Sequence, residues 1–242
     1  MIRFLRPFDP RSIRLLIFDL DGTLVDSRLD LIHSVNAMLR HFGRPELEGD
    51  VIASYVGDGA PALVQRALVA DGDGGDEAFC RSALEYFLGY YRLHKLDHTT
   101  VYEGILETLS VLANGSDSAH SPAGPRLSRQ MAVLSNKPVN PSRAIVEALG
   151  MGDFFVRVYG GNSFATKKPD PLGVRTLLDE IGVSAGEALM IGDSSVDVLT
   201  GRNAGIWTCG VTYGFAPHSL AEVAPDVVVD RAHELGELLS GS

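Results

Sequence analysis

The sequence predicts an α/β fold, in which an open parallel sheet carries helices on both faces and is interrupted by an all-helical insertion. Short apolar runs alternate with helix-like segments over most of the chain, which is typical of parallel strands joined by crossover helices. Residues 26–98 break this alternation, because their apolar residues follow helical spacing alone. We therefore expect a Rossmann-like core from residues 1–25 and 99–242, and an inserted helical cap domain from residues 26–98.

The first expected strand is the apolar run Leu15 to Phe18, and two acids, Asp19 and Asp21, follow it directly. A short apolar run of this kind is typical of a strand buried in a parallel sheet. If the extended geometry continues, the two carboxylates leave the chain on the same side and crowd one spot. Without a cation they repel each other. A simple turn is the alternative, because Asp and Gly22 are ordinary turn residues.

The expected insertion contains several helices. Apolar residues recur at helical spacing from Ile32 to Phe42 and again from Phe79 to Tyr91. Between these stretches, the turn Gly57-Asp58-Gly59 precedes a helix that has Pro61 near its first position. Ser27 and Asp30 have the spacing of a capping box at the start of the first helix.

Strand and helix signals alternate again after the insertion. Helices are expected in GILETLSVLA, PSRAIVEALGM, PLGVRTLLDEIG and SSVDVLTGRNAG, and strands in QMAVLSN, FFVRVYGG, EALMIGD, WTCGVTYG and DVVVD. Residues 114–128 are rich in Ser, Gly and Pro, and we expect a surface connection there with His120 exposed to solvent.

Polar clusters follow three of the expected core strands. They are Asp19 to Thr23, Ser135 to Lys137, and Gly192 to Asp197. In open α/β sheets, ligands bind just beyond the carboxyl ends of the strands. Each cluster alone is an ordinary turn or helix start, but three such ends in one sheet predict a shared site.

The residue types in these clusters favour phosphate chemistry. Asp19, Asp21 and Asp193 offer the hard oxygen ligands that suit Mg²⁺. A cation such as Lys168, in the loop ATKKPDP, is needed before a pocket rich in carboxylates accepts a phosphate dianion. Asp197 lies one helical turn after Asp193, where it could hold either a metal-bound water or Lys168.

Composition limits the expected partners and location. The chain has 242 residues, a 45% hydrophobic content and a formal charge of −10, from 21 Lys and Arg against 31 Asp and Glu. This acidity argues against nucleic-acid and anionic-membrane surfaces. The cysteines Cys80 and Cys209 are far apart in sequence, which favours free buried thiols. With no signal-like or membrane-spanning run, we expect a cytoplasmic protein, either a monomer or a homodimer.

Four motifs, taken in order, resemble those of the haloacid dehalogenase superfamily: DLDGTLVDS, LSNKP, KKPDP and IGDSSVDV. The helical block after the first motif resembles the inserted cap of that superfamily. Finer detail in VDSRLDLIHSVNAML, VGDGAPALVQRAL and GVTYG is similar to the phosphoglycolate phosphatase family within it. The resemblance covers most of the chain from Arg14 to about Asp230. It implies hydrolysis of phosphate esters with Mg²⁺ as cofactor.

The resemblance implies a role for each residue of the first motif. Asp19 is then the nucleophile that attacks phosphorus and forms an aspartyl-phosphate. Asp21 acts first as the acid that protonates the leaving alkoxide and then as the base that activates water, and its backbone carbonyl binds the metal. Gly22 permits the tight turn beside the substrate, and Thr23 orients the acid pair.

The other motifs supply the remaining ligands in the same resemblance. Ser135 and Asn136 hold the phosphoryl oxygens, and Lys168 balances charge at both the catalytic and the substrate position. Asp193 completes the metal site, to which Asp197 belongs directly or through water.

The substrate stays open at this point. A small phosphorylated metabolite is expected, with 2-phosphoglycolate the first candidate, and sugar phosphates, amino-sugar 6-phosphates and pyrophosphate the alternatives. A phosphosugar mutase shares the four motifs, and a non-catalytic relative that binds a ligand or a protein is a third possibility. The Gly57-Asp58-Gly59 turn is either the loop that reaches into the pocket or a plain connection between two helices.

Overall fold

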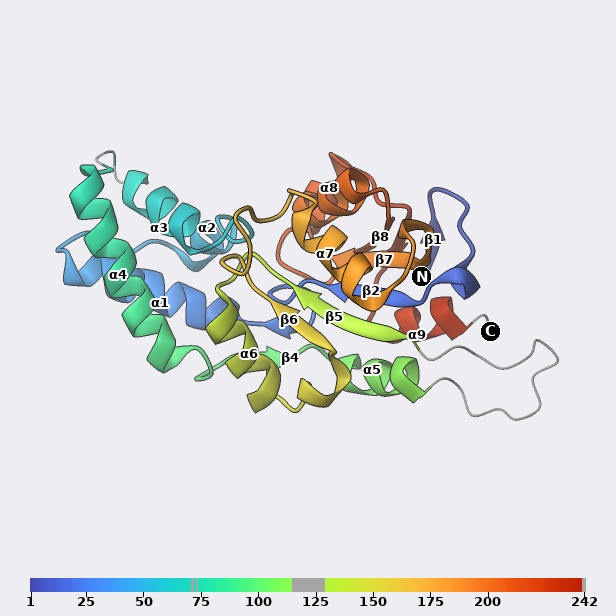
Figure 1. Cartoon of the computed structure of the whole chain (residues 1–242). Coiled ribbons are helices and arrows are strands. Elements are labelled where there is room, and N and C mark those ends of the chain that lie inside the picture. The colour runs from blue at the N-terminus through green and yellow to red at the C-terminus, as the bar shows by residue number, and fades with distance from the viewer. Residues whose placement is uncertain (71, 73, 115–128, 241–242) are drawn as a thin grey trace.

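A computed structural model describes residues 1–70, 72, 74–114 and 129–240. Its main sheet has seven strands in the order β1-β9-β8-β7-β2-β5-β6, and every neighbouring pair is parallel except β1 with β9 at one edge (Figure 1). These strands are β1 (Arg3–Phe4), β2 (Leu15–Phe18), β5 (Gln130–Leu134), β6 (Arg157–Tyr159), β7 (Ala188–Gly192), β8 (Trp207–Val211) and β9 (Val227–Val229).

The helices fall into two groups along the chain. The first group is α1 (Arg28–His41), α2 (Gly49–Ala53), α3 (Ala60–Val69) and α4 (Glu77–His94). The second group is α5 (Ile105–Asn114), α6 (Val139–Ala148), α7 (Leu172–Ile181), α8 (Ser195–Ala204) and α9 (His233–Ser240). Short 3₁₀ turns lie at Pro10–Ser12, Gly152–Phe154, Ala185–Glu187 and Pro217–Ala221.

Helices cover both faces of the sheet, as the sequence predicts. The four residues of β2 are buried, and successive side chains point to opposite faces. Leu16 and Phe18 pack in the cluster that contains residues of α5, α6 and α9, whereas Leu15 and Ile17 pack in the cluster that contains residues of α7. A strand buried on both faces has no polar alternation, which explains its continuous apolar run.

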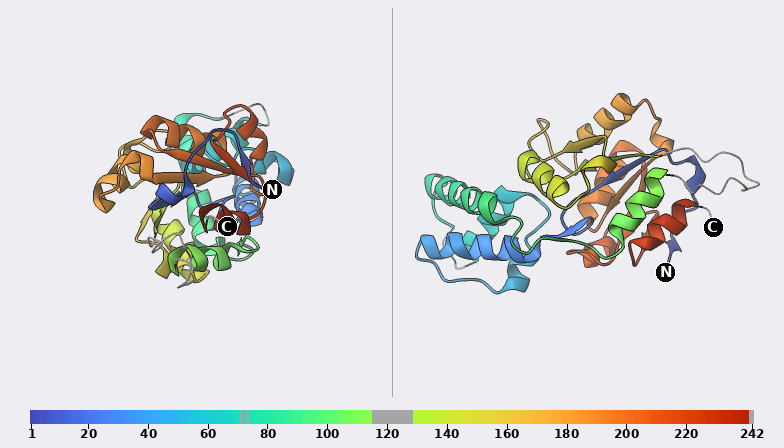
Figure 2. Two further views of the ribbon diagram at one scale, coloured as in Figure 1. Left: turned by 90° about the vertical axis from the view of Figure 1, so that its right-hand side faces the viewer. Right: turned by 90° about the horizontal axis from the view of Figure 1, so that it is seen from below.

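Helices α1 to α4 form a separate unit beside the sheet (Figure 2). They surround their own hydrophobic cluster, which includes Val35, Leu68 and Phe87. Pro61 lies in the first turn of α3, as predicted. Burying these side chains against one another stabilises the unit without contribution from the sheet, since each buried apolar side chain is worth about 1.5–3 kcal/mol.

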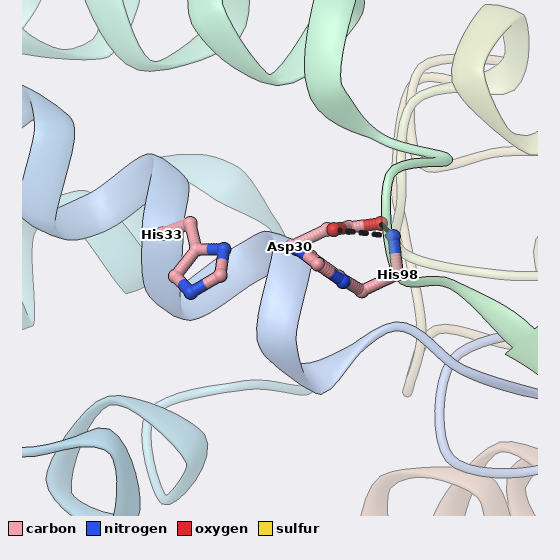
Figure 3. Close-up of side chains that lie close together, drawn as sticks. All are labelled: Asp30, His33 and His98. Atoms are coloured by element: carbon pink, nitrogen blue, oxygen red, sulfur yellow. Dashed lines mark hydrogen bonds between the residues drawn. The ribbon is translucent and has the colours of Figure 1, made fainter.

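The chain enters and leaves this unit through two short strands, β3 (Val25–Asp26) and β4 (Thr100–Val101), which pair antiparallel. The predicted capping box at Ser27 and Asp30 is wrong, because Ser27 makes no side-chain cap at α1. Instead, the Asp30 carboxylate accepts hydrogen bonds from the backbone N–H of His98 (Figure 3). It also accepts them from the backbone N–H and the hydroxyl of Thr99.

Asp30 therefore joins the start of α1 to the residues that lead into β4. Figure 3 also places the rings of His33 and His98 near this carboxylate, with ring centres 5.1 Å apart. Because the Asp30 oxygens accept hydrogen bonds from the returning chain, we assign the carboxylate a structural role at the base of the helical unit.

The elements predicted from apolar patterning are confirmed, whereas β1, α2, β3, β4 and α9 were not predicted. The insertion at residues 114–128, including His120, lies outside the described residues after Asn114, the last residue of α5. Both cysteines are free, with Cys209 buried and Cys80 half-buried. No helix among the described residues is long and apolar enough to span a bilayer.

Candidate active site

The site lies at the carboxyl ends of three neighbouring strands in the interior of the sheet. Strand β2 pairs in parallel with both β5 and β7, so the three carboxyl ends lie side by side. A pocket open to solvent lies between these strand ends and the helical unit. The core contributes polar lining residues to it: Asp19, Asp21, Ser135, Asn136, Lys137, Asp193 and Ser194. The predicted convergence of the three polar clusters is thus confirmed.

Three carboxylates form an acidic cluster: each of Asp19, Asp193 and Asp197 offers an oxygen, and these atoms lie within 4.8 Å of one another. All three side chains are nearly or fully buried, with Asp19 9% exposed. Asp21 is not a member of this cluster, so the predicted crowding of its carboxylate against Asp19 is not what the structure shows. The strand ends at Phe18, and the chain turns before Asp21.

Lys168 supplies the positive charge in the acidic cluster. Its ammonium lies 2.9 Å from Asp19 Oδ1 and donates a 2.6 Å hydrogen bond to Asp197 Oδ1. Burial acts to lower the pKa of Lys168, but the two carboxylates outweigh it and hold the pKa above its usual value. Of the two roles predicted for Asp197, the structure shows the hold on Lys168, and the hold on a metal-bound water stays a prediction.

The second oxygen of Asp197 is also engaged. Asp197 Oδ2 accepts hydrogen bonds from the Ser194 hydroxyl at 2.7 Å and the Ser194 backbone N–H at 3.2 Å, which close a capping box at the start of α8. Asp197 is therefore fixed by the helix that carries it. Asp19 and Asp193 are the members of the acidic cluster that face the pocket.

Asp193 is oriented by the loop that follows β8. Its Oδ2 accepts hydrogen bonds from the backbone N–H groups of Phe215 at 2.6 Å and Ala216 at 3.2 Å. The first-motif glycine fits against it, because a Cβ on Gly22 would lie 2.3 Å from the same oxygen. Gly22 has φ +84°, so the turn and the close approach both require glycine.

The acidic cluster carries more negative charge than Lys168 alone offsets. Burial, with smaller contributions from Asp197 and Asp19, raises the pKa of Asp193 to about 7. Burial also raises the pKa of Asp19 to about 6, against the opposing charge of Lys168. Hard carboxylate oxygens grouped this closely fit a divalent cation such as Mg²⁺. The positive charge of such an ion would counter both the burial and the neighbouring carboxylates, and so lower both pKa values.

Asp21 has a different partner, Lys137, which sequence reasoning left without a role. The Lys137 ammonium donates to both Asp21 oxygens, at 2.7 and 3.0 Å, and the Ser27 hydroxyl donates to Asp21 Oδ1 at 2.6 Å. The ammonium also lies 4.5 Å from the ring centre of Tyr91 on α4. Lys137 directly follows Ser135 and Asn136 in sequence, so the signal was its place in the second motif.

The predicted phosphate-binding pair lies at the end of β5. Ser135 Oγ accepts a hydrogen bond from the backbone N–H of Lys137 at 3.3 Å, and both Ser135 and Asn136 line the pocket. The Asn136 amide donates to the carbonyls of Gly57 at 3.1 Å and Lys168 at 3.0 Å. Asn136 thereby joins the core motifs to the helical unit.

The Gly57-Asp58-Gly59 turn reaches the pocket, which answers the question left by the sequence. Gly57 and Gly59 both line it, and the Lys167 ammonium donates to the Asp58 carbonyl. Gly59 has φ +86°, and a Cβ there would lie 2.9 Å from the Asn136 carbonyl oxygen. Only glycine allows this turn to approach the core so closely.

Thr23 is fully buried next to the first motif. Its Oγ1 has no hydrogen-bond partner among the described residues, while its backbone carbonyl accepts a hydrogen bond from the Tyr213 hydroxyl at 3.1 Å. The structure therefore shows Thr23 packed under the turn, and the predicted orienting role has no hydrogen bond to support it.

Comparison with known proteins identifies the class. The family model for haloacid dehalogenase-like hydrolases matches residues 16–211. The chain belongs to this family.

The curated relatives narrow the class to a phosphatase. A phosphoglycolate phosphatase from Rhodospirillum rubrum is 38% identical over 228 residues, which cover 93% of this chain and 90% of the relative. Another from Pseudomonas syringae pv. tomato is 35% identical, with 97% of this chain and 83% of the relative covered. A crystal structure of a predicted phosphoglycolate phosphatase from Haemophilus somnus has a TM-score of 0.83 and 29% identity, covering 93% of this chain and 97% of that one.

Proposed function

We propose that this phosphatase is Mg²⁺-dependent, acts through an aspartyl-phosphate on Asp19, and hydrolyses a small phosphorylated metabolite, with 2-phosphoglycolate as the first candidate. The observation that carries the proposal is the position of the Asp19 carboxylate, which lines the pocket while Lys168 and the acidic cluster surround it. The names of the relatives support the choice of substrate.

Each residue has a role in this mechanism. Asp19 attacks phosphorus, and Ser135 and the backbone N–H of Asn136 hold the phosphoryl oxygens. Lys168 keeps Asp19 ionised and ready to attack. Asp21 gives a proton to the leaving alkoxide and later takes one from water.

Asp19, Asp193 and the backbone carbonyl of Asp21 would hold the metal, with Asp197 acting through Lys168. When bound, Mg²⁺ would neutralise part of the charge on the carboxylates and on the phosphate oxygens. Lys137 and Ser27 orient the Asp21 carboxylate through the hydrogen bonds that they donate.

The helical unit of residues 26–98 acts as the cap in this proposal. Its residues line the pocket opposite the core, where they exclude water from the reacting phosphate and contact the leaving group. The cytoplasmic location, the lack of a nucleic-acid partner and the monomeric or dimeric state stay predictions from the sequence.

The test is a panel of phosphate esters assayed for phosphate release with Mg²⁺ and with a chelator. The panel contains 2-phosphoglycolate, sugar phosphates, an amino-sugar 6-phosphate, pyrophosphate and p-nitrophenyl phosphate. We expect activity that needs Mg²⁺, with the highest kcat/KM for 2-phosphoglycolate. Asp19→Asn is the matched control, since it keeps the shape of the side chain but loses the nucleophile.

Two outcomes would contradict the proposal. Turnover no greater than that of Asp19→Asn would favour a non-catalytic binding protein. Interconversion of sugar phosphate isomers without phosphate release would favour a mutase. A β-phosphoglucomutase from Clostridium difficile shares this fold with a TM-score of 0.72, but at 19% identity the likeness extends to the fold alone.

A further inference from the structure

The pocket has a polar floor from the core and a largely apolar roof from the helical unit. In the described part of the chain, the roof consists of Leu31 on α1, five residues between Val56 and Leu63, and Phe87, Leu88 and Tyr91 on α4. Tyr91 is the one among them with a polar side chain. A leaving group that enters this pocket meets one hydrogen-bonding side chain on the roof.

The Tyr91 hydroxyl is buried, and its O–H group has no acceptor among the described residues. The side chain is 3% exposed, and its O–H group donates no hydrogen bond to any described residue. The Lys137 ammonium lies 4.5 Å from the ring centre and also interacts with the phenol oxygen, but an ammonium can only donate, so the Tyr91 O–H group still lacks an acceptor. Burial raises the pKa of Tyr91 to about 12, so the phenol stays protonated at neutral pH and can donate a hydrogen bond. Buried hydroxyl groups almost always have a partner, so this one points to a ligand.

The charges around the pocket indicate which chemical group that ligand carries. Asp19, Asp21 and Asp193 make the floor acidic, so a second anionic group on a substrate needs a positive or donating partner, and Lys137 lies at the Asp21 side of this floor, paired with that carboxylate. Lys137 is the one cationic side chain among the described lining residues, and it lies beside Tyr91. A phenol donor next to an ammonium is suited to a carboxylate.

We propose that Tyr91 and Lys137 form the leaving-group subsite, in which they bind the carboxylate of a small phosphate ester. Tyr91 is then a specificity-determining residue contributed by the helical unit. The inference rests on the proposed function, because it takes the floor of the same pocket as the phosphate site. It adds to the proposed function the two side chains that would bind the carboxylate of 2-phosphoglycolate, which the phosphate-binding residues of the floor do not provide.

The experiment compares two substrates that differ at this group. Ethyl phosphate carries a methyl group where 2-phosphoglycolate carries its carboxylate. We expect the wild-type protein to prefer 2-phosphoglycolate in kcat/KM, and Tyr91→Phe to reduce that preference by about 10-fold or more, mainly through KM, because one hydrogen bond to a charged group is lost. Lys137 is left unchanged, since its removal would also release Asp21.

Tyr102→Phe is the matched control. Its hydroxyl is also buried and donates no hydrogen bond to any residue that the structure describes, but Tyr102 does not line the pocket, so this variant should keep the wild-type preference. Both variants keep the ring, so folding should be retained, which thermal melting checks. A preference in Tyr91→Phe equal to that of the wild type would overturn the inference.

A further measurement needs no variant. Glycolate should inhibit hydrolysis of ethyl phosphate at lower concentration than ethylene glycol, which has the same size and no charge. Equal inhibition would also overturn the inference. The proposed phosphatase function would stand in both cases, provided that phosphate is released from either ester. No release from either ester would instead contradict the proposed function.

Discussion

Lys168 is the residue on which the charge balance of the acidic cluster depends. It is buried between Asp19 and Asp197. Replacing it by Met would leave two buried carboxylates without a cation, which costs about 3–5 kcal/mol for a broken buried pair. We expect Lys168→Met to lower the free energy of unfolding by about that amount, and kcat/KM by at least about 100-fold. Urea unfolding and a phosphatase assay measure the two effects.

The neighbouring lysine provides the control. Lys167 is exposed, and its ammonium donates to the carbonyl of Asp58 rather than to a carboxylate. Lys167→Met should change the free energy of unfolding little and leave far more activity than Lys168→Met. Equal losses in the two variants would mean that general loss of positive charge, and not the buried pair, is what matters.

Binding of a divalent cation to the acidic cluster should depend on pH. The pKa values of Asp19 and Asp193 are raised to about 6 and about 7, so without metal the folded state holds protons there that the unfolded state releases above pH 3.8. A raised carboxyl pKa favours the folded state at low pH and penalises it as pH rises toward 7. Protons therefore compete with the ion. We expect Mg²⁺ to raise Tm more at pH 8 than at pH 5.5.

Two variants separate this effect from general salt binding. Asp193→Asn should lose most of the Mg²⁺ shift at pH 8. Asp226→Asn should keep the Mg²⁺ shift in Tm. Asp226 is also buried, but its carboxylate accepts hydrogen bonds from Thr208, away from the acidic cluster. A shift that is the same in both variants, or independent of pH, would count against metal binding at the acidic cluster.

Among the elements, the Gly57-Asp58-Gly59 turn couples the helical unit to the core. A Cβ at Gly59 would press on the Asn136 carbonyl, and φ +86° is strained for any other residue. Gly59→Ala should displace the turn and Asn136 together. We expect kcat/KM to fall by about 10-fold, since catalysis is sensitive to small displacements of positioning groups.

Gly43 is the control for backbone strain alone. It also has a positive φ, +68°, but a Cβ there meets no atom of the described residues within 4 Å. Gly43→Ala should lower stability by about 1 kcal/mol through strain while leaving kcat/KM near that of the wild type. If both variants lost activity equally, the close approach of the turn would have no special role.

At the level of elements, helices and strands with a long apolar pattern can be predicted from the sequence, whereas the shortest strands cannot. Strand β2 and helix α4 carry continuous apolar or helical patterns, so their type could be predicted. Strands β3 and β4 have two residues each, which is too short for any periodic signal. The contact of Asp30 with Thr99 joins residues 69 apart in sequence, and local spacing instead suggested a capping box that does not form.

At the scale of the whole molecule, the order of the strands brings the polar residues of the site together, because β2 lies between β5 and β7. The sequence predicts which strands end in polar residues, and a parallel sheet places those ends at one edge. It does not reveal that Asp21 turns away from Asp19 toward Lys137, because that depends on where β2 stops and on a lysine of another motif. Tyr91 was likewise hidden, since its place in the pocket depends on how the helical unit packs over the core.

The central claim is that Asp19 attacks phosphorus and carries the phosphoryl group, and chemical trapping tests it most directly. Asp21→Asn should slow hydrolysis of the intermediate, while p-nitrophenolate can leave without a proton from Asp21. Acid quenching during turnover, borohydride reduction and peptide mass mapping should then show Asp19 converted to homoserine, only when both Mg²⁺ and p-nitrophenyl phosphate are present. Continued release of p-nitrophenolate with Asp19 unmodified, or with another residue modified in its place, would contradict the claim.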